Sequence, residues 1–282
     1  MALIYHYCDT NAFVSIVQSN ALRLSSVLSM NDSGELSFFR NAVLPAVIKS
    51  VSSNPNLTNE KDLIHATIAE ADCYSVCFSE NGDDLYQWQA YGGKGKGISI
   101  GFDPSELCVF RLMFDFNNMS VIVKRTKDPL PKVELAKVTY LDTSRVEAFA
   151  SRFKEAMMAF NPNDGGRGID SFNRFIVAAC KTVKNSAFIA ENEHRLMYSP
   201  VITDPVAIGE IEKVEGVLKE RKWRVGTYGI TPYFDYPDKV KAAMREVVIG
   251  PGCIESEEQA KTFLRSQGIV NVNVTRSKST LR

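Results

Sequence analysis

Hydrophobic and polar positions alternate in short runs along the chain, and these runs predict more strands than helices. Residues 3–8 are apolar enough for a buried strand, and Asp9 or Thr10 can cap the helix that follows. Further strands are predicted at 21–24, 73–79, 98–102, 109–114, 120–124, 133–140, 247–249 and 270–275, with extended segments at 206–217 and 223–231. Helices are predicted at 36–45, 144–160, 170–189 and 237–245, and from Ser256, where Gln259 completes a capping box.

The regular alternation of strand and helix that builds a doubly wound parallel sheet is missing, so a mixed α+β fold fits the pattern better. A length of 282 residues suits one large domain or two small ones, and 45% hydrophobic residues are ample for a packed core. The polar run 52–59 buries little and is predicted to be a surface loop rather than a domain boundary. We therefore predict a single domain over residues 1–282.

The net charge and the length of the apolar runs limit the classes of function that the chain can have. Thirty-three Lys and Arg against 33 Asp and Glu give a net charge of zero, so no global field attracts a polyanion or a membrane surface. A nucleic-acid contact would need a local basic patch, for which Lys94, Lys96, Lys124, Arg125 and Lys127 are candidates. Apolar runs are far shorter than a membrane span, and the N-terminus lacks a basic leader. We expect a cytoplasmic protein without a membrane partner.

Cysteine and histidine spacing argues against a disulfide framework and against a metal site. The six cysteines contain no C-x-x-C pair, and most lie in apolar segments, as buried free thiols do. The three histidines are far apart in the sequence and show no H-x-x-x-H spacing. We predict free thiols and no metal.

Glu191 and Glu193 are the candidate catalytic residues. They follow a predicted helix and begin a strand, where residues two apart share a face, and two carboxylates on one face usually mark a solvated edge. The apolar run 196–198 and the cation Arg195 instead favour the mouth of a buried strand. In a pocket, one such carboxylate can bind a ribose hydroxyl and stabilise an oxocarbenium-like transition state.

His6 lies between two tyrosines on the first strand, where a lone histidine is usually part of the core. Next to a polar ligand, a neutral imidazole can bond a ribose hydroxyl, and Tyr7 can stack on a planar ring. Trp88 and Tyr91 stand three residues apart on a short helix that Asp83 and Asp84 can cap, a spacing typical of core packing. They can equally wall a nicotinamide.

The glycine-rich run 92–97 is not a phosphate-binding loop. It lacks the P-loop spacing and the Ser or Thr after the lysine. Its helix precedes the glycines, whereas a phosphate cradle places the helix after them. We predict a turn whose Lys94 and Lys96 can contact an anionic ligand.

These short motifs, in this order, resemble the bacterial domain of unknown function 2971 family across nearly the whole chain. Ser33 and His194 depart from the resemblance, because the family usually has proline and tryptophan there. The motifs that carry it are residues 3–7, Asn31-Asp32 to Glu35, 77–80, Trp88-x-x-Tyr91, 97–102, Glu191-x-Glu193-x-Arg195, 248–251 and Ser277-Lys278.

A second resemblance, to ADP-ribosyltransferase folds, supplies a function. The Ile4-Tyr5-His6 strand with its helix is similar to the start of such folds, and Glu191-x-Glu193 is similar to their [Glu/Gln]-x-Glu motif. The resemblance implies split, twisted, mixed or antiparallel sheets with flanking helices around a central NAD cleft. Glu193 would be the catalytic glutamate, and Glu191 would help present the acceptor. His6 would bind the ribose, and the other expected NAD-binding residues are Tyr7, Asn31, Trp88, Tyr91 and Arg195.

The leading hypothesis is an ADP-ribosyltransferase that moves ADP-ribose from NAD to a macromolecule, as a toxin or phage-defence effector. A nucleic acid, RNA or DNA, is favoured over protein as acceptor, and an antitoxin protein is an expected partner. The first rival is an NAD glycohydrolase on the same fold, with water as acceptor. The second is a catalytically inactive module that binds a nucleotide or a partner protein.

Overall fold

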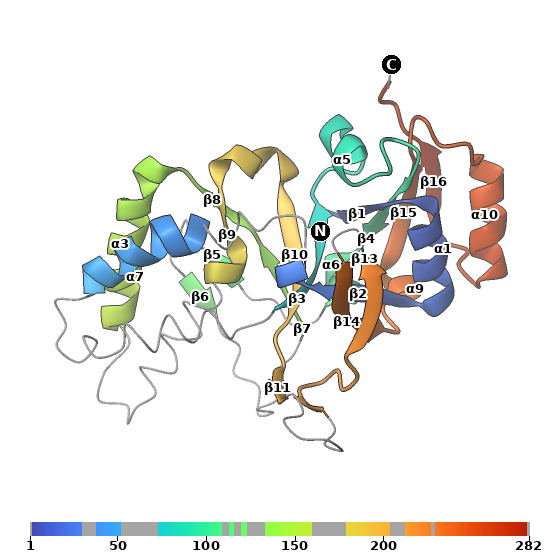
Figure 1. Cartoon of the computed structure of the whole chain (residues 1–282). Helices are drawn as coiled ribbons and strands as arrows, with labels where there is room; N and C mark the ends of the chain where they lie inside the picture. Colours follow the sequence, from blue (N-terminus) through green and yellow to red (C-terminus); the bar gives the residue numbers. More distant parts are fainter. Residues whose placement is uncertain are drawn as a thin grey trace.

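One mixed sheet organises the fold, and the predicted α+β class is confirmed (Figure 1). The computed structural model describes residues 2–29, 38–51, 73–108, 113–115, 120–122, 133–159, 179–203, 212–226 and 229–280. Its strands are β1 (Ile4–Cys8), β2 (Ala21–Ser26), β3 (Tyr74–Ser79), β4 (Ile98–Phe102), β5 (Met113–Asp115), β6 (Ser120–Ile122), β7 (Val133–Lys137), β8 (Thr139–Leu141), β9 (Val183–Asn185), β10 (Glu193–Tyr198), β11 (Val201–Thr203), β12 (Lys213–Glu215), β13 (Lys222–Gly226), β14 (Gly229–Pro237), β15 (Met244–Ile249) and β16 (Asn273–Arg276).

Helices flank the sheet on both sides in Figure 1, with α1, α9 and α10 at one end and α3 and α7 at the other. The 3₁₀ helices are η1 (Val27–Ser29), η4 (Thr143–Arg145) and η5 (Ser186–Glu191), and η2 (Phe39–Val43) is a π-helix. The α-helices are α1 (Thr10–Ser19), α3 (Leu44–Val51), α5 (Leu85–Ala90), α6 (Pro104–Leu107), α7 (Val146–Ala159), α9 (Val240–Ala243) and α10 (Glu257–Ser266).

The main sheet runs in the order β13-β14-β2-β3-β1-β4-β15-β16, and β10 pairs with β3 and with β7. Along one edge of β3, β10 is paired throughout. Along the other edge, β2 pairs with Tyr74 and Ser75, whereas β1 pairs with Ser79 at the opposite end. The two strands therefore diverge across the middle of β3, and the sheet is split above residues 76–78.

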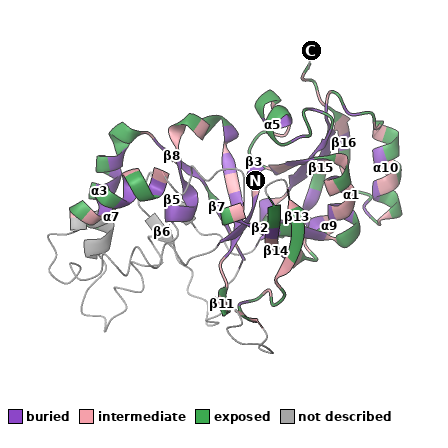
Figure 2. Ribbon diagram, in the orientation of Figure 1, coloured by how far each residue is buried: buried purple, intermediate pink, exposed green. Residues whose placement is uncertain are grey.

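Local sequence signals explain the two helices that pack on the sheet near the N-terminal strands. Asp9 caps α1 by accepting a hydrogen bond from the backbone of Ala12, as expected from the sequence. Ser256 and Gln259 form both hydrogen bonds of the predicted capping box at the start of α10. The apolar faces of these helices enter a core of strand residues, which Figure 2 shows as the buried centre of the molecule.

Three helix predictions were wrong at their ends. The helix predicted over 170–189 ends before β9, because residues 183–185 pair in parallel with β8. Residues 186–191 then form the 3₁₀ helix η5. The helix predicted to stop at Pro45 continues to Val51, and the π-helical turn η2 directly before α3 is the irregularity that accompanies the proline. The helix predicted over 237–245 is the single turn α9, because β14 and β15 extend into both of its ends.

The strand predicted over 133–140 is two strands, β7 and β8. The strand predictions at 109–114 and 120–124 are confirmed where they coincide with β5 and β6. The surface loop predicted at 52–59 lies outside the described residues. Among the residues described, no helix combines the length and the apolar character needed to cross a membrane.

Candidate functional site

A cavity of about 390 Å³ opens where β1 and β2 diverge above β3. Volumes of this size hold small ligands and cofactors. Facing the gap, the carbonyl oxygen of Cys77 on β3 bonds the His6 ring. The cavity thus follows from the split in the sheet. Its lining comes from β1, α1, β2, β3, α5, β9, β10 and β13 and includes Glu191 of η5.

Glu191 and Glu193 both line the cavity, although they do not share a strand face as the sequence suggested. Glu191 ends η5, Asn192 adopts a left-handed conformation with φ of 43°, and Glu193 begins β10. Asparagine is one of the residues that tolerate this conformation. Both glutamates are buried, each with 4% of its surface exposed.

Two cations hold the carboxylates, and the sequence identified only one of them. Arg195 forms a two-point contact with Glu193, through Nε at 2.7 Å and Nη2 at 3.0 Å. Lys184 Nζ lies 2.6 Å from Glu191 and 3.5 Å from Glu193. Lys184 was missed because its segment was predicted to be helical, whereas it lies on β9 beside the carboxylates. The residues next to Lys184 in the sequence form no pattern that would mark it as part of a site.

The two carboxyl groups differ in their electrostatics. Burial raises the pKa of Glu191, and the contact with Lys184 only partly opposes this effect. Burial also acts to raise the pKa of Glu193, but the Arg195 guanidinium outweighs it and lowers that pKa to about 2. Glu193 is therefore anionic across the physiological range, and Glu191 is the more basic carboxylate.

Neighbouring side chains fix the orientation of both glutamates. The Tyr91 hydroxyl donates to Oε1 of Glu191 at 2.8 Å, and the Gln87 amide donates to the Glu191 carbonyl at 3.2 Å. The backbone N–H of Glu193 donates to the Tyr140 hydroxyl at 2.9 Å. Of the two aromatic residues predicted on the short helix, Tyr91 thus reaches the site.

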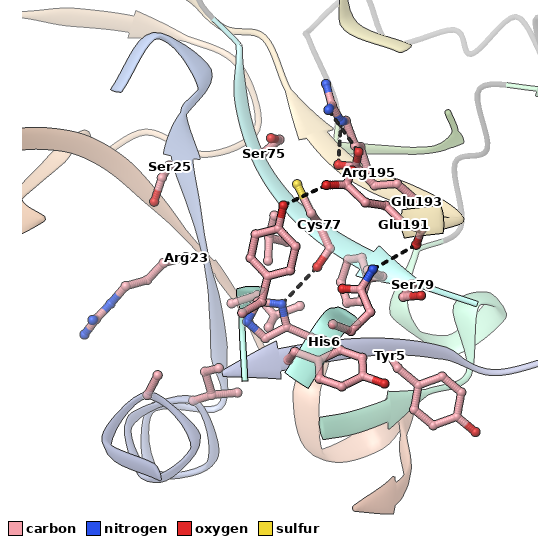
Figure 3. A pocket seen from close by; sticks show the side chains of 18 of the residues that line it. Tyr5, His6, Arg23, Ser25, Ser75, Cys77, Ser79, Glu191, Glu193 and Arg195 are labelled. Atoms are coloured by element: carbon pink, nitrogen blue, oxygen red, sulfur yellow. Dashed lines mark hydrogen bonds and ion pairs between the residues drawn. The ribbon is translucent and has the colours of Figure 1, made fainter. Parts of the chain in front are cut away.

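His6 lies in the middle of the cavity wall, between the carboxylates and Arg23 (Figure 3). Its Nδ1 is 3.0 Å from the carbonyl oxygen of Cys77, and its ring meets Phe78 edge-on at 5.8 Å. Burial lowers the pKa of His6, and the hydrogen bond to Cys77 offsets this only in part. The imidazole is consequently neutral at physiological pH.

Tyr7 and Trp88, which the sequence proposed as ligand-stacking residues, have different positions. Tyr7 lines the cavity, and its hydroxyl donates to the carbonyl of Asn81 at 2.8 Å. Trp88 is fully buried against Tyr7, is absent from the lining, and donates its indole N–H to Asp83 at 2.8 Å. For Trp88 the geometry favours the core alternative. Asn31 lies outside the described residues.

Arg23 and Arg224 form a second polar end of the cavity that the sequence did not indicate. Arg23 is on β2 and Arg224 is on β13, and both are exposed. Arg224 donates to the Ser25 hydroxyl at 3.1 Å, and Arg23 donates to the Ser15 hydroxyl at 3.2 Å. Nothing in the surrounding residues distinguishes these arginines from ordinary surface residues, and only the sheet order brings them together.

The glycine-rich run 92–97 is a turn, as predicted. It packs against the turn after β15 through hydrogen bonds from Gly250 and Gly252. Lys94 and Lys96 are exposed and do not belong to the cavity lining. In the described part of the chain, no group of three or more His, Cys, Asp or Glu side chains is placed to hold a metal ion. All six cysteines are free thiols, and Cys77 lines the cavity.

Comparisons with known proteins identify a family for one segment. Neither the curated proteins nor the solved structures include a significant match to the chain. A family model described as "Protein of unknown function (DUF2971)" matches residues 87–196, the segment that contains Gln87, Tyr91, Lys184, both glutamates and Arg195. The match confirms the predicted resemblance to the DUF2971 family over this segment.

Proposed function

We propose that the protein is an NAD-dependent ADP-ribosyltransferase built as a single ADP-ribosyltransferase-like domain over residues 1–282. One observation carries the proposal: His6 on β1 and the carboxylates of Glu191 and Glu193 line the same cavity. Strands β1 and β10, which carry His6 and Glu193, are distant in the sequence and are not adjacent in the sheet. The split sheet around this cavity supports the same fold type.

The chemistry of the two carboxylates suits cleavage of the bond between nicotinamide and ribose. When that bond breaks, its electron pair leaves with the nicotinamide nitrogen, and positive charge develops on the ribose. Glu193, ionised at neutral pH, can accept a hydrogen bond from a ribose hydroxyl and stabilise that charge. His6 can bond another hydroxyl of the dinucleotide.

Glu191 fits the role of base toward the acceptor. Its raised pKa makes it the better proton acceptor of the pair at neutral pH. As a nucleophilic atom of the acceptor bonds to the ribose carbon, the proton of that atom passes to Glu191. A nucleic acid is the favoured acceptor, the setting is a cytoplasmic toxin or phage-defence system, and an antitoxin protein is a proposed partner.

One observation favours the inactive binding module as a second candidate. Both carboxylates are already held by cations, with Glu193 paired to Arg195 and Glu191 to Lys184. A carboxylate in such a pair accepts a further hydrogen bond less strongly than a free one. A glycohydrolase would use the same NAD site with water in place of the acceptor.

Incubation of the pure protein with NAD distinguishes the three functions. Release of nicotinamide that rises on adding RNA or DNA, with label from the adenine moiety of NAD retained on the nucleic acid, supports the transferase. Release that is independent of any macromolecule supports the glycohydrolase. NAD binding without release supports the binding module, and the transferase proposal then fails.

Glu193→Gln is the matched test of mechanism. We expect it to lower nicotinamide release by a factor of about 100 or more, on the scale of removing one preorganised electrostatic stabiliser. Glu258→Gln, on the exposed surface of α10, is the control and should keep full activity. Because Glu193 is buried, circular dichroism and thermal unfolding must first show that the variant is folded. Normal turnover in folded Glu193→Gln would exclude the glutamate from the mechanism.

A further inference from the structure

The cavity carries an excess of positive charge, although the whole chain is neutral. Two of its cations are neutralised by the two carboxylates at one end. The remaining positive charge, about two units, belongs to Arg23 and Arg224 at the other end. The charged residues of the lining are the cations Arg23, Lys184, Arg195 and Arg224 and the carboxylates Glu191 and Glu193.

Neither arginine is paired with a carboxylate within the described part of the chain. Each bonds one serine hydroxyl, and the guanidinium of Arg23 also lies 5.5 Å from the ring centre of Tyr233. Asp235 is opposite Arg23 in the strand register, but its carboxylate contacts Lys222 at 3.1 Å. A guanidinium has five N–H donors, so most donors of both arginines are available to a ligand.

The strand order brings both arginines to one face of the sheet. β2 and β13 border β14 on opposite sides, with Arg23 opposite Asp235 and Arg224 opposite Thr231. These two β14 residues are four positions apart, so they share a face, and their partners lie on that same face. Residue 234, between them, points the other way into the core.

We propose that Arg23 and Arg224 form the subsite for the diphosphate group of a dinucleotide. A diphosphate linkage carries two negative charges, which match the excess charge of this end. Guanidinium groups bind phosphate oxygens through paired N–H donors. The position of His6 between Arg23 and the carboxylates then matches a ligand whose diphosphate and reacting ribose lie on either side of it. The identification with NAD rests on the proposed function, whereas the phosphate subsite does not.

Binding calorimetry with ADP, adenosine and inorganic pyrophosphate tests the subsite directly. In the double variant Arg23→Gln/Arg224→Gln, we expect ADP and pyrophosphate to bind about 100-fold more weakly, about tenfold for each guanidinium group removed. Adenosine should bind with unchanged affinity. Arg265→Gln, on the exposed face of α10, removes an arginine away from the cavity and should change none of the three affinities.

The conservative variant Arg23→Lys/Arg224→Lys separates the geometry of the arginines from their charge. It should bind ADP with an intermediate affinity, because lysine keeps the charge but loses the paired donors. The proposal is overturned if ADP binds the wild type no more tightly than adenosine. Equal ADP affinity of the wild type and the glutamine double variant would overturn it as well.

NAD turnover in the same variants keeps the two proposals distinct. If the wild type binds ADP through the arginines but leaves NAD intact, the subsite stands and the proposed transferase fails. If the wild type cleaves NAD and the glutamine double variant does so with unchanged KM and kcat, the subsite fails and the transferase stands.

Discussion

The two ends of the cavity use charge in opposite ways. At the carboxylate end, Glu191 and Glu193 are buried, and the cations Lys184 and Arg195 touch them directly. At the arginine end, Arg23 and Arg224 are exposed and bond only hydroxyl groups among the described residues. Buried charge is strongly unfavourable unless it is paired, whereas exposed charge is solvated by water.

The carboxylate end therefore has a fixed arrangement of charges, whereas the arginine end is open to a ligand. The buried end is held by ion pairs and hydrogen bonds whose loss would expose an unpaired charge in the interior. The open end can exchange water for a ligand at little energetic cost to the fold. Figure 3 shows Arg23 and the two glutamates in one view, with His6 between them. Three predictions test whether the ends differ in this way.

The largest effect is expected for Lys184→Met, which removes the cation shared by the two buried glutamates. Breaking a buried ion pair on one side costs about 3–5 kcal/mol of folding free energy, because the remaining charge has no partner. Urea unfolding followed by circular dichroism measures the loss. A decrease below about 1 kcal/mol would mean that Arg195 or water already compensates both carboxylates.

A double-mutant cycle supplies the control for Lys184→Met. Adding Glu191→Gln removes the carboxylate that contacts Lys184 most closely, at 2.6 Å. The double variant should therefore recover part of the lost stability, since the orphaned charge is gone. If the two substitutions add without recovery, Lys184 stabilises the fold by packing against Phe188, which its ammonium group approaches to 4.5 Å from the ring centre.

A smaller effect is expected from the pH dependence at His6, between the two ends. Burial lowers the folded-state pKa of His6 below the ordinary value. Below about pH 6.5 the unfolded chain therefore binds a proton that the folded protein does not, and the folded state loses stability as the pH falls. His6→Gln should remove on the order of 1 kcal/mol of the stability loss between pH 7.5 and pH 5.5.

The neighbouring carboxylates do not produce the same loss of folding stability as the pH falls. Glu191 has a raised pKa, so its folded state takes up a proton first, and acidification favours folding through that group. Glu193 keeps its charge down to about pH 2, and the stability that it contributes is lost only below the window tested. Identical pH profiles for the wild type and His6→Gln would show that His6 is not held neutral.

Sequence periodicity was sufficient for most of the central sheet and for the residues that form one wall of the cavity. The alternation at β1, β3 and β4 and the caps of α1 and α10 are local signals, and the structure confirms them. His6 and the two glutamates could be selected because each stood at an unusual position in an apolar segment. Their convergence in one cavity was a hypothesis that local patterns could not establish.

The residues that were missed depend on long-range pairing. Lys184 reaches the carboxylates because β9 pairs with β8, and its sequence neighbourhood favoured a helix. Arg23 and Arg224 are brought to one sheet face by β14, which separates their strands. Trp88 shows the converse, because an aromatic residue at helical spacing packs in the core unless tertiary structure turns it toward a ligand.

The smallest effect is expected for the single variants Arg23→Gln and Arg224→Gln, whose folding free energies should stay within about 0.5 kcal/mol of the wild type. Each arginine is exposed and loses a hydrogen bond to a serine, for which water can substitute, and Arg23 also loses its exposed contact with the Tyr233 ring. Urea unfolding at low and at high salt measures the change, and any small gain at low salt would reflect relief of repulsion between like charges.

Ser25→Ala is the matched control, since it removes the hydroxyl that Arg224 bonds but leaves both charges in place. A loss of more than about 1 kcal/mol in either arginine variant, with no comparable loss in Ser25→Ala, would mean that these charges stabilise the fold as Lys184 does. The two ends of the cavity would then be electrostatically alike, and the arginines would have less charge available for a ligand.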